Sequence, residues 1–186
     1  MPPQRKDAAR NWDRITAVAR ELVDEGTPLQ LNDVARRAGL GVGTVYRHFA
    51  TTEALLETIA TPRLEHLTAH GRQALTADDP WHALRDFLER TVEAQVTDPS
   101  MVKVVAATTD ALPHTTELKQ QLWSIGNALF ARARDAGHVR PTVHDSDIVP
   151  LMCGIAYAVL VHGDKPDDRI TSAHRYLDTL LEGLHA

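Results

Sequence analysis

The segment from residue 31 to residue 50 constrains the fold most, because its small and apolar residues stand at the offsets that a helix-turn-helix requires. Two short helices that cross steeply need a small residue at the crossing and a turn residue that tolerates positive φ, and Ala35 and Gly39 occupy these positions. The residues that would close the core between them are Val34, Ala38, Leu40, Val45 and either His48 or Phe49. We predict a helix-turn-helix over about residues 30–49; an ordinary hairpin of two helices is the alternative interpretation.

The rest of the chain also predicts helices, since apolar residues recur at intervals of three and four without strand-like alternation. The apolar face of the first helix consists of Ile15, Val18, Ala19, Leu22 and Val23. Gly26 followed by Pro28 should end this helix. A longer helix should begin near Thr52, and Pro62 should kink it or end its first part. The predicted fold class is therefore all-α.

Aspartate–proline pairs indicate where later helices begin. Asp79-Pro80 and Asp98-Pro99 each combine a capping carboxylate with a proline in the first turn. The inward face of the helix that starts at Pro80 is predicted to hold Trp81, Leu84, Leu88, Val92 and Gln95. Three further helices are expected at about residues 116–136, 146–162 and 168–184.

Charge is distributed unevenly along the chain, whose formal net charge is −5. Residues 1–52 carry eight Lys/Arg and six Asp/Glu, a net of +2, whereas the remainder carries twelve and nineteen, a net of −7. A mildly basic end on an acidic body suits a protein that contacts DNA with one end only. We predict a three-helix helix-turn-helix DNA-binding domain at residues 1–52 and a larger helical ligand-binding and dimerisation domain at residues 53–186, with the transition in the helix near Thr52.

Composition and the lack of catalytic motifs exclude several classes of protein. The single cysteine, Cys153, cannot form an internal disulfide and fits a reducing cytoplasm. The charged N-terminal stretch resembles no secretory signal, and the longest apolar run is too short to cross a bilayer, so we expect a cytoplasmic protein without membrane contact. We expect no enzyme activity and no cofactor, since no phosphate loop, nucleophile elbow, HExxH or CxxC occurs. His66 and His70 have metal-ligand spacing but no identifiable third ligand, so we expect no metal.

The stretch Gly39–Phe49, GLGVGTVYRHF, resembles the recognition-helix signature of the TetR family of bacterial transcriptional regulators. Residues 33–39 (DVARRAG) and 52–56 (TEALL) match the same family, and the C-terminal part resembles the branch with an SbtR-like sensor domain. The resemblance implies a homodimer that binds a double-stranded DNA operator and is released from it by an unknown small-molecule effector. The open alternatives are a TetR-like activator, a regulator controlled by a protein partner, and a helical enzyme or carrier with a fortuitous hairpin.

The resemblance also assigns roles to individual residues. Those that would open the recognition helix and face the major groove are Gly41, Val42, Gly43 and Thr44. Tyr46 and His48 would hold phosphates, and Arg47 would contact a phosphate or a base. Arg5 and Lys6, placed before the first helix, would form an arm on the DNA backbone. Where the family often carries lysines, this chain has Ala50, Thr51 and Thr52. Its hold on phosphate should therefore be weaker, although the N-terminus of the next helix still attracts phosphate.

A ligand pocket needs apolar walls with a few polar groups. The candidates are Trp81, Phe87, Met101, Trp123, Asn127, Phe130 and Tyr157, for each of which plain core packing is the alternative. The last two helices resemble the dimer interface of the family, and the helix over residues 148–161 is apolar on nearly all sides. The predicted interface residues are Leu151, Ile155, Ala158, Tyr176, Leu177 and Leu181.

Overall fold

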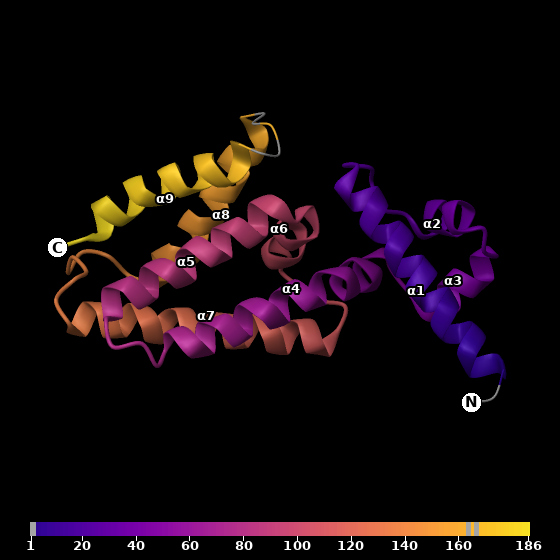
Figure 1. The fold of residues 1–186 in the computed structure, drawn as a ribbon, viewed down its shortest axis with the longest axis horizontal. Helices are drawn as coiled ribbons and strands as arrows, with labels where there is room; N and C mark the ends of the chain where they lie inside the picture. The colour runs from indigo at the N-terminus through magenta and orange to yellow at the C-terminus, as the bar shows by residue number, and fades with distance from the viewer. Residues whose placement is uncertain (1–2, 163–164, 166–167) are drawn as a thin grey trace.

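The computed structural model describes residues 3–162, 165 and 168–186, and these residues form nine α-helices (Figure 1). One end of the elongated molecule is formed by α1 (Pro3–Asp24), α2 (Leu31–Ala38) and α3 (Val42–His48). Helix α4 (Thr52–Ala74) runs from this end into the larger, C-terminal group of helices. That group comprises α5 (Pro80–Thr97), α6 (Pro99–Ala106), α7 (Pro113–Asp135), α8 (Asp145–Val161) and α9 (Arg169–Leu184). The predicted all-α fold class is confirmed.

The N-terminal helices share a core of their own. Its buried members come from α1 to α4 and from the residue that follows α3. They are Ile15, Val18, Ala19, Leu22, Val23, Leu31, Val34, Ala35, Ala38, Val45, Phe49, Leu55 and Ile59. Gly39 ends α2 in the left-handed conformation, with φ of 61°, which confirms its predicted place in the turn. Phe49 is buried and His48 is only half-buried, so Phe49 closes the core between the two helices. The first turns of α4 also belong to this core, since Leu55 and Ile59 pack into it.

The two aspartate–proline pairs begin helices as predicted. The Asp79 carboxylate accepts hydrogen bonds from the backbone N–H groups of Trp81 (2.9 Å) and His82 (3.0 Å). These bonds, led by that from His82, hold the pKa of Asp79 below its usual value, because they stabilise the ionised form. Asp98 likewise caps α6 through the N–H of Ser100 at 3.0 Å.

The start of α1 differs from the expectation, and at Pro62 the structure excludes a helix end but not a kink. Helix α4 continues through Pro62 to Ala74. A proline removes one backbone donor and disturbs the carbonyls of the preceding turn, and here the guanidinium of Arg20 in α1 donates to the Ile59 carbonyl of that turn. Helix α1 begins at Pro3, so Lys6 lies inside a helix and not in an arm before it. Proline favours the first helical position, and the residues that follow it are good helix formers.

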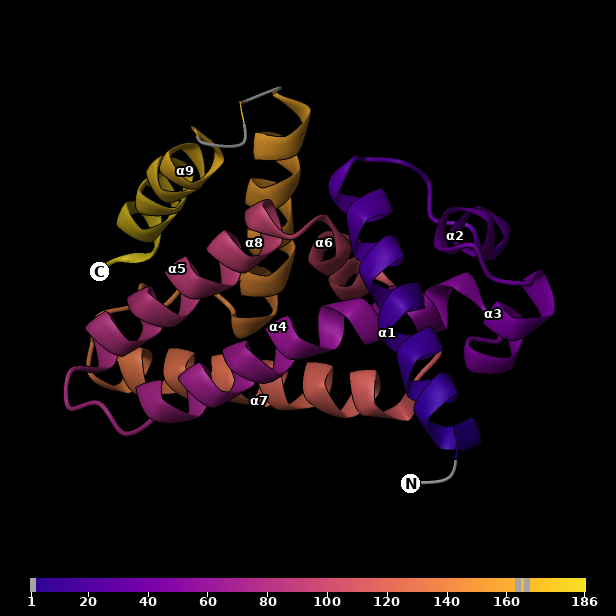
Figure 2. The same ribbon diagram turned by 45° about the vertical axis from the view of Figure 1, so that its right-hand side comes forward.

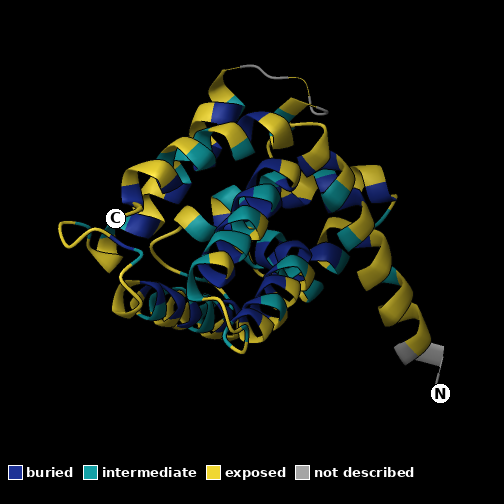
Figure 3. Cartoon of the chain, turned by 60° about the vertical axis from the view of Figure 1, so that its left-hand side comes forward, coloured by how far each residue is buried: buried dark blue, intermediate teal, exposed yellow. Residues whose placement is uncertain are grey.

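The C-terminal helices surround a second, larger core. Its buried members include Leu84, Leu88, Val92, Leu129, Phe130, Met152, Ala156, Leu177 and Leu181. Helix α8 runs steeply across the direction of α7 (Figure 2), and buried residues concentrate on the faces that the helices turn toward one another (Figure 3). None of the described helices combines the length and the apolar character needed to cross a membrane.

Side chains of α5 and α7 pack tightly against α4 at Gly71. A Cβ atom at this position would lie 2.8 Å from Phe87 Cε2 and 2.8 Å from Ile125 Cγ2. Contacts this short do not occur between packed carbon atoms, so glycine is required for the three helices to meet in this way.

Candidate DNA-binding surface and sensor cavity

Helix α3 presents most of the predicted DNA contacts on its exposed side. Val42 is 47% exposed and Tyr46 is similarly accessible, whereas Val45 between them is buried against the core. The exposed residues of this surface are Gly41, Val42, Gly43, Tyr46 and Arg47. The Arg47 side chain folds back along the helix, where Nε donates to the Gly43 carbonyl (3.2 Å) and Nη2 to Thr44 Oγ1 (3.3 Å). Thr44 and His48 are half-buried beside this surface.

Two arginines of α2, next to α3, are paired with carboxylates. Arg36 forms an ion pair with Asp33 (2.7 Å), and Arg37 pairs with Glu25. The hydrogen bond from Arg37 lowers the pKa of Glu25. At the start of α4, Thr51 Oγ1 accepts from the Ala54 N–H (3.1 Å). Lys6 is exposed on α1, while the side chain of Arg5 lies outside the described part of the chain.

A cavity of about 170 Å³ lies between α4, α5, α6, α7 and α8. Its lining is almost entirely aliphatic and aromatic, with polar atoms from a few residues. Five predicted pocket residues line it together, namely Phe87, Met101, Trp123, Asn127 and Phe130. Trp123 is 61% exposed and, with Asp145 and Val149, marks the mouth of the cavity.

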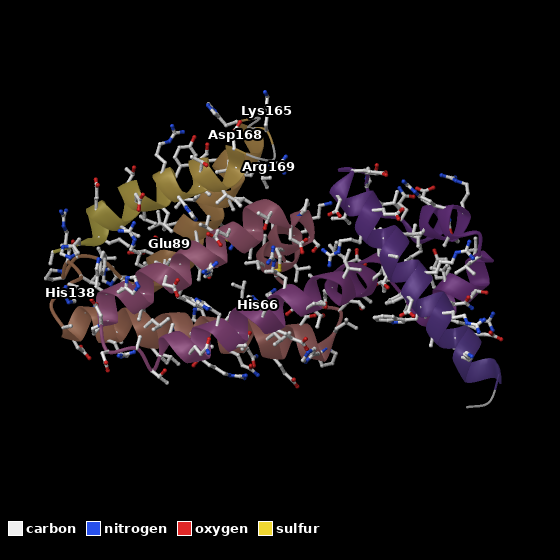
Figure 4. All side chains as sticks on the ribbon, viewed as in Figure 1. His66, Glu89, His138, Lys165, Asp168 and Arg169 are labelled. Atoms are coloured by element: carbon white, nitrogen blue, oxygen red, sulfur yellow. The ribbon has the colours of Figure 1, made fainter. Side chains whose placement is uncertain are left out.

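Two predicted pocket residues lie elsewhere. Trp81 packs edge-on against His185, with ring centroids 4.7 Å apart, and near His138 at the end of the molecule that is remote from α3 (Figure 4). Tyr157 is 66% exposed on α8. Both were selected as aromatic residues in helical segments. Trp81 stands in the first turn of α5, next to His185 near the C-terminus, and the phase of α8 turns Tyr157 outward.

The sequence analysis placed Gln95 on the inward face of its helix but not among the pocket candidates, although it is the most enclosed polar residue of the cavity wall. Gln95 on α5 is only 3% exposed and lines the cavity. In the described part of the chain its side-chain amide forms no hydrogen bond. The sequence signal for a pocket residue was the position of Gln95 in an otherwise apolar helical face, because a buried polar side chain there needs a hydrogen-bond partner.

Two polar contacts join the cavity-bearing helices to the N-terminal helices. Arg20 of α1 forms an ion pair with Asp98, the cap of α6, at 2.8 Å. Glu57 of α4 is buried, and its carboxylate accepts from the backbone N–H groups of Ala111 (2.7 Å) and Leu112 (2.9 Å), just before α7. Asp98 and Leu112 stand at the starts of helices that line the cavity, so these contacts connect the cavity-bearing helices with α1 and α4.

The two histidines with metal-ligand spacing do not line the cavity. His70 Nε2 contacts Asp86 Oδ2 at 2.7 Å. His66, labelled on α4 in Figure 4, faces clefts that Arg20, Arg63 and Thr97 also line. Among the described residues, no group of three or more His, Cys, Asp or Glu side chains is placed to hold a metal ion.

The exposed faces of α8 and α9 form an apolar surface, which we call the α8–α9 patch. It consists of Pro150, Leu151, Gly154, Ile155, Ala158, Tyr176, Thr179 and Leu180. Four predicted interface residues belong to it, but Leu177 and Leu181 are buried in the core of their own protomer. One residue turns a helix position by about 100°, so Tyr176 and Leu180 stay partly exposed while Leu177 and Leu181 are buried.

The fold and these surfaces define a helix-turn-helix protein with a larger helical domain that contains an apolar cavity. Residues 15–59 match the family model described as bacterial regulatory proteins, tetR family. Residues 79–186 match the C-terminal domain of SbtR-like transcriptional regulators. The chain therefore belongs to the TetR family and carries an SbtR-like C-terminal domain. This family consists of DNA-binding transcriptional regulators that are not enzymes, as the sequence predicted.

Individual relatives agree with this assignment. The TetR transcriptional regulator SCO0520 from Streptomyces coelicolor is 31% identical, with 94% of this chain and 98% of that chain covered and a TM-score of 0.57. A TetR regulatory protein from Mycobacterium vanbaalenii is 30% identical, with 99% and 100% covered and a TM-score of 0.53. The HTH-type transcriptional regulator SAUSA300_2515 of Staphylococcus aureus is 30% identical over 91 residues, 48% of each chain. The chain thus matches about half the length of its curated relatives.

Proposed function

We propose that this regulator is a homodimeric repressor, which binds a near-palindromic operator and releases it when a small molecule enters the cavity. The observation that carries the proposal is the structural connection between cavity and DNA-binding helices. Met101 of α6 lines the cavity, and Asp98 at the start of the same helix is bonded to Arg20 of α1. A ligand that prefers one arrangement of α6 would bias the spacing of the two α3 helices toward or away from that of the operator.

In this proposal residues 1–52 form the DNA-binding domain and residues 53–186 the sensor and dimerisation domain. The exposed side of α3 enters the major groove, with Gly41, Val42, Gly43 and Thr44 nearest the bases. Tyr46, His48 and Arg47 contact the backbone or flanking bases. The accessibility of Val42 and Tyr46 supports these roles.

The α8–α9 patch supports the proposed dimer. Helix α8 exposes Val149, Leu151, Tyr157 and Val161, more apolar surface than a single helix in water normally leaves uncovered. Two copies of α8 and α9 related by a two-fold axis would cover this surface as a four-helix bundle. Such a dimer supplies the paired recognition helices that a palindromic operator requires.

A gel-shift assay with the DNA beside the regulator's own gene tests the proposed function. We expect retardation of that DNA by the dimer, and little retardation of a shuffled DNA of equal length and composition. A protein that retards both DNAs equally, or neither, would exclude the proposed operator binding.

Tyr46→Phe should weaken binding to the operator and to unrelated DNA by a similar factor, about fivefold to tenfold, because one phosphate hydrogen bond is lost. Ser124→Ala is the matched control, since it also removes an exposed hydroxyl but lies on α7, outside the α8–α9 patch. The measurement is fluorescence anisotropy with both DNAs. A loss confined to the operator would assign Tyr46 to base recognition.

Val42→Ala should change the base preferred at one position of each half-site, at a cost of about 1–3 kcal/mol for a good contact. The physical reason is the loss of methyl groups that can pack against a thymine methyl. The measurement is selection from randomised DNA, with Ile170→Ala as a control at an exposed β-branched residue of α9 outside the α8–α9 patch. Identical preferred sequences for Val42→Ala and wild type would contradict the placement of Val42 in the groove.

A further inference from the structure

The sensor cavity is small and its volume limits the ligand. It encloses about 170 Å³. For comparison, an engineered apolar cavity of about 150 Å³ in another protein binds benzene. A single ring with small substituents therefore fills this cavity, whereas a long acyl chain or a fused polycyclic skeleton exceeds it.

The charges around the cavity disfavour an anionic ligand. Lys119 is the only basic residue in the described lining, and its Nζ already contacts Asp110 Oδ1 (2.7 Å) and the carbonyls of Ala107 (2.8 Å) and Val104 (3.2 Å). Asp145 stands at the mouth and repels a carboxylate or phosphate. The walls between these residues are apolar, so an anion would lose its hydration without gaining a partner.

The side-chain amides of Gln95 and Asn127 both line the cavity, and Gln95 is the more enclosed of the two. The Gln95 amide is nine-tenths buried or more and forms no hydrogen bond within the described residues. An amide can donate and accept, so it suits a hydroxyl or carbonyl group on an otherwise apolar ring. By contrast, the hydroxyl of Thr91 in the same wall already donates to the Phe87 carbonyl at 2.8 Å.

We propose that the effector is an uncharged, single-ring molecule that carries one hydrogen-bonding group, and that Gln95 binds this group. The proposal rests on the proposed function insofar as the cavity is the sensor site. Gln95 lies one helical turn before Asp98, which bonds Arg20 of α1. Ligand binding at Gln95 therefore acts on the α5–α6 junction, which is directly attached to the DNA-binding domain.

Calorimetric titration of the DNA-free protein with three probes of similar size tests the ligand class. The probes are 4-ethylphenol, ethylbenzene, which lacks the hydroxyl, and 4-ethylbenzoate, which is ionised at neutral pH. We expect 4-ethylphenol to bind about tenfold more tightly than ethylbenzene and at least about a hundredfold more tightly than 4-ethylbenzoate. Equal or tighter binding of 4-ethylbenzoate, or no binding of any probe, would overturn the proposed class.

Variants of Gln95 test the proposed contact. In Gln95→Leu the preference for 4-ethylphenol over ethylbenzene should disappear, while ethylbenzene binds at least as well as before. Gln95→Met serves the same purpose if the leucine variant is poorly folded, and Gln120→Leu on the exposed side of α7 is the matched control. An unchanged preference in a folded Gln95 variant would show that another residue binds the hydroxyl. Failure of the proposed repressor function is separately visible, as a protein that binds 4-ethylphenol but does not retard operator DNA.

Discussion

Ile155→Asp should convert the proposed dimer into monomers and weaken operator binding by about 10²–10⁴-fold. Ile155 lies in the α8–α9 patch, beside Leu151 and Ala158. In a two-fold contact the new carboxylate would meet its own copy in an apolar surrounding, which costs far more than the contact contributes. Each monomer would retain its recognition helix but lose the gain in affinity that comes from linking two of them.

Light scattering at micromolar concentration and operator binding measure the effect together. Ile170→Asp is the control, because Ile170 lies on α9 in the cleft with His66 and Arg90, away from the patch. Leu181→Asp differs in kind, since Leu181 is 3% exposed within its own protomer and the variant should unfold. A wild-type protein that is monomeric and still binds its operator would contradict the proposed interface.

Asp98→Ala should lower the free energy of unfolding by about 2–4 kcal/mol, because the variant loses both a helix cap and a charged hydrogen bond. Asp98 caps α6 through Ser100 and binds Arg20 at 2.8 Å from a largely buried position. Asp98→Asn separates the two contributions, since asparagine is an equally good cap but carries no charge. We expect Asp98→Asn to lose about 1–2 kcal/mol, the smaller part of the total.

Denaturant unfolding measures the stability of these variants, and release of operator DNA on addition of 4-ethylphenol measures their response to a ligand. In Asp98→Asn the cavity and α3 are unchanged, so 4-ethylphenol and the operator should each bind nearly as tightly as they bind the wild type. We expect 4-ethylphenol to release the operator less effectively, because the contact between α6 and α1 is weakened. Arg37→Met removes the exposed pair with Glu25 within the DNA-binding end and should leave release unaffected. Normal release by Asp98→Asn would mean that coupling runs through another contact, such as Glu57 with the start of α7.

Features that depend on neighbouring residues in the chain were predictable. Gly39 stands where α2 must end, and Asp79-Pro80 and Asp98-Pro99 begin helices, because capping and turn chemistry act over a few residues. Five pocket residues were also found together, since large apolar residues on inward faces of a helical bundle converge.

Features that depend on tertiary contacts were not predictable in the same way. The continuity of α4 through Pro62 involves Arg20, which is far away in the sequence. The burial of Leu177 and the outward position of Tyr176 depend on the rotation of α9 about its axis, which adjacent apolar residues leave undetermined. Glu57 is a charged residue in a helix, and nothing local shows that its carboxylate would meet the backbone before α7.

The close approach at Gly71 gives the regulator a means of changing ligand selectivity from outside the cavity. Gly71 does not line the cavity, but Phe87 touches it on one side and lines the cavity on the other. A methyl group at residue 71 would press the Phe87 ring toward the ligand and reduce the space that a ring substituent can occupy. In the proposed sensor, effector range can thus change at a helix-packing position, while the residues that line the cavity or contact DNA keep their identity.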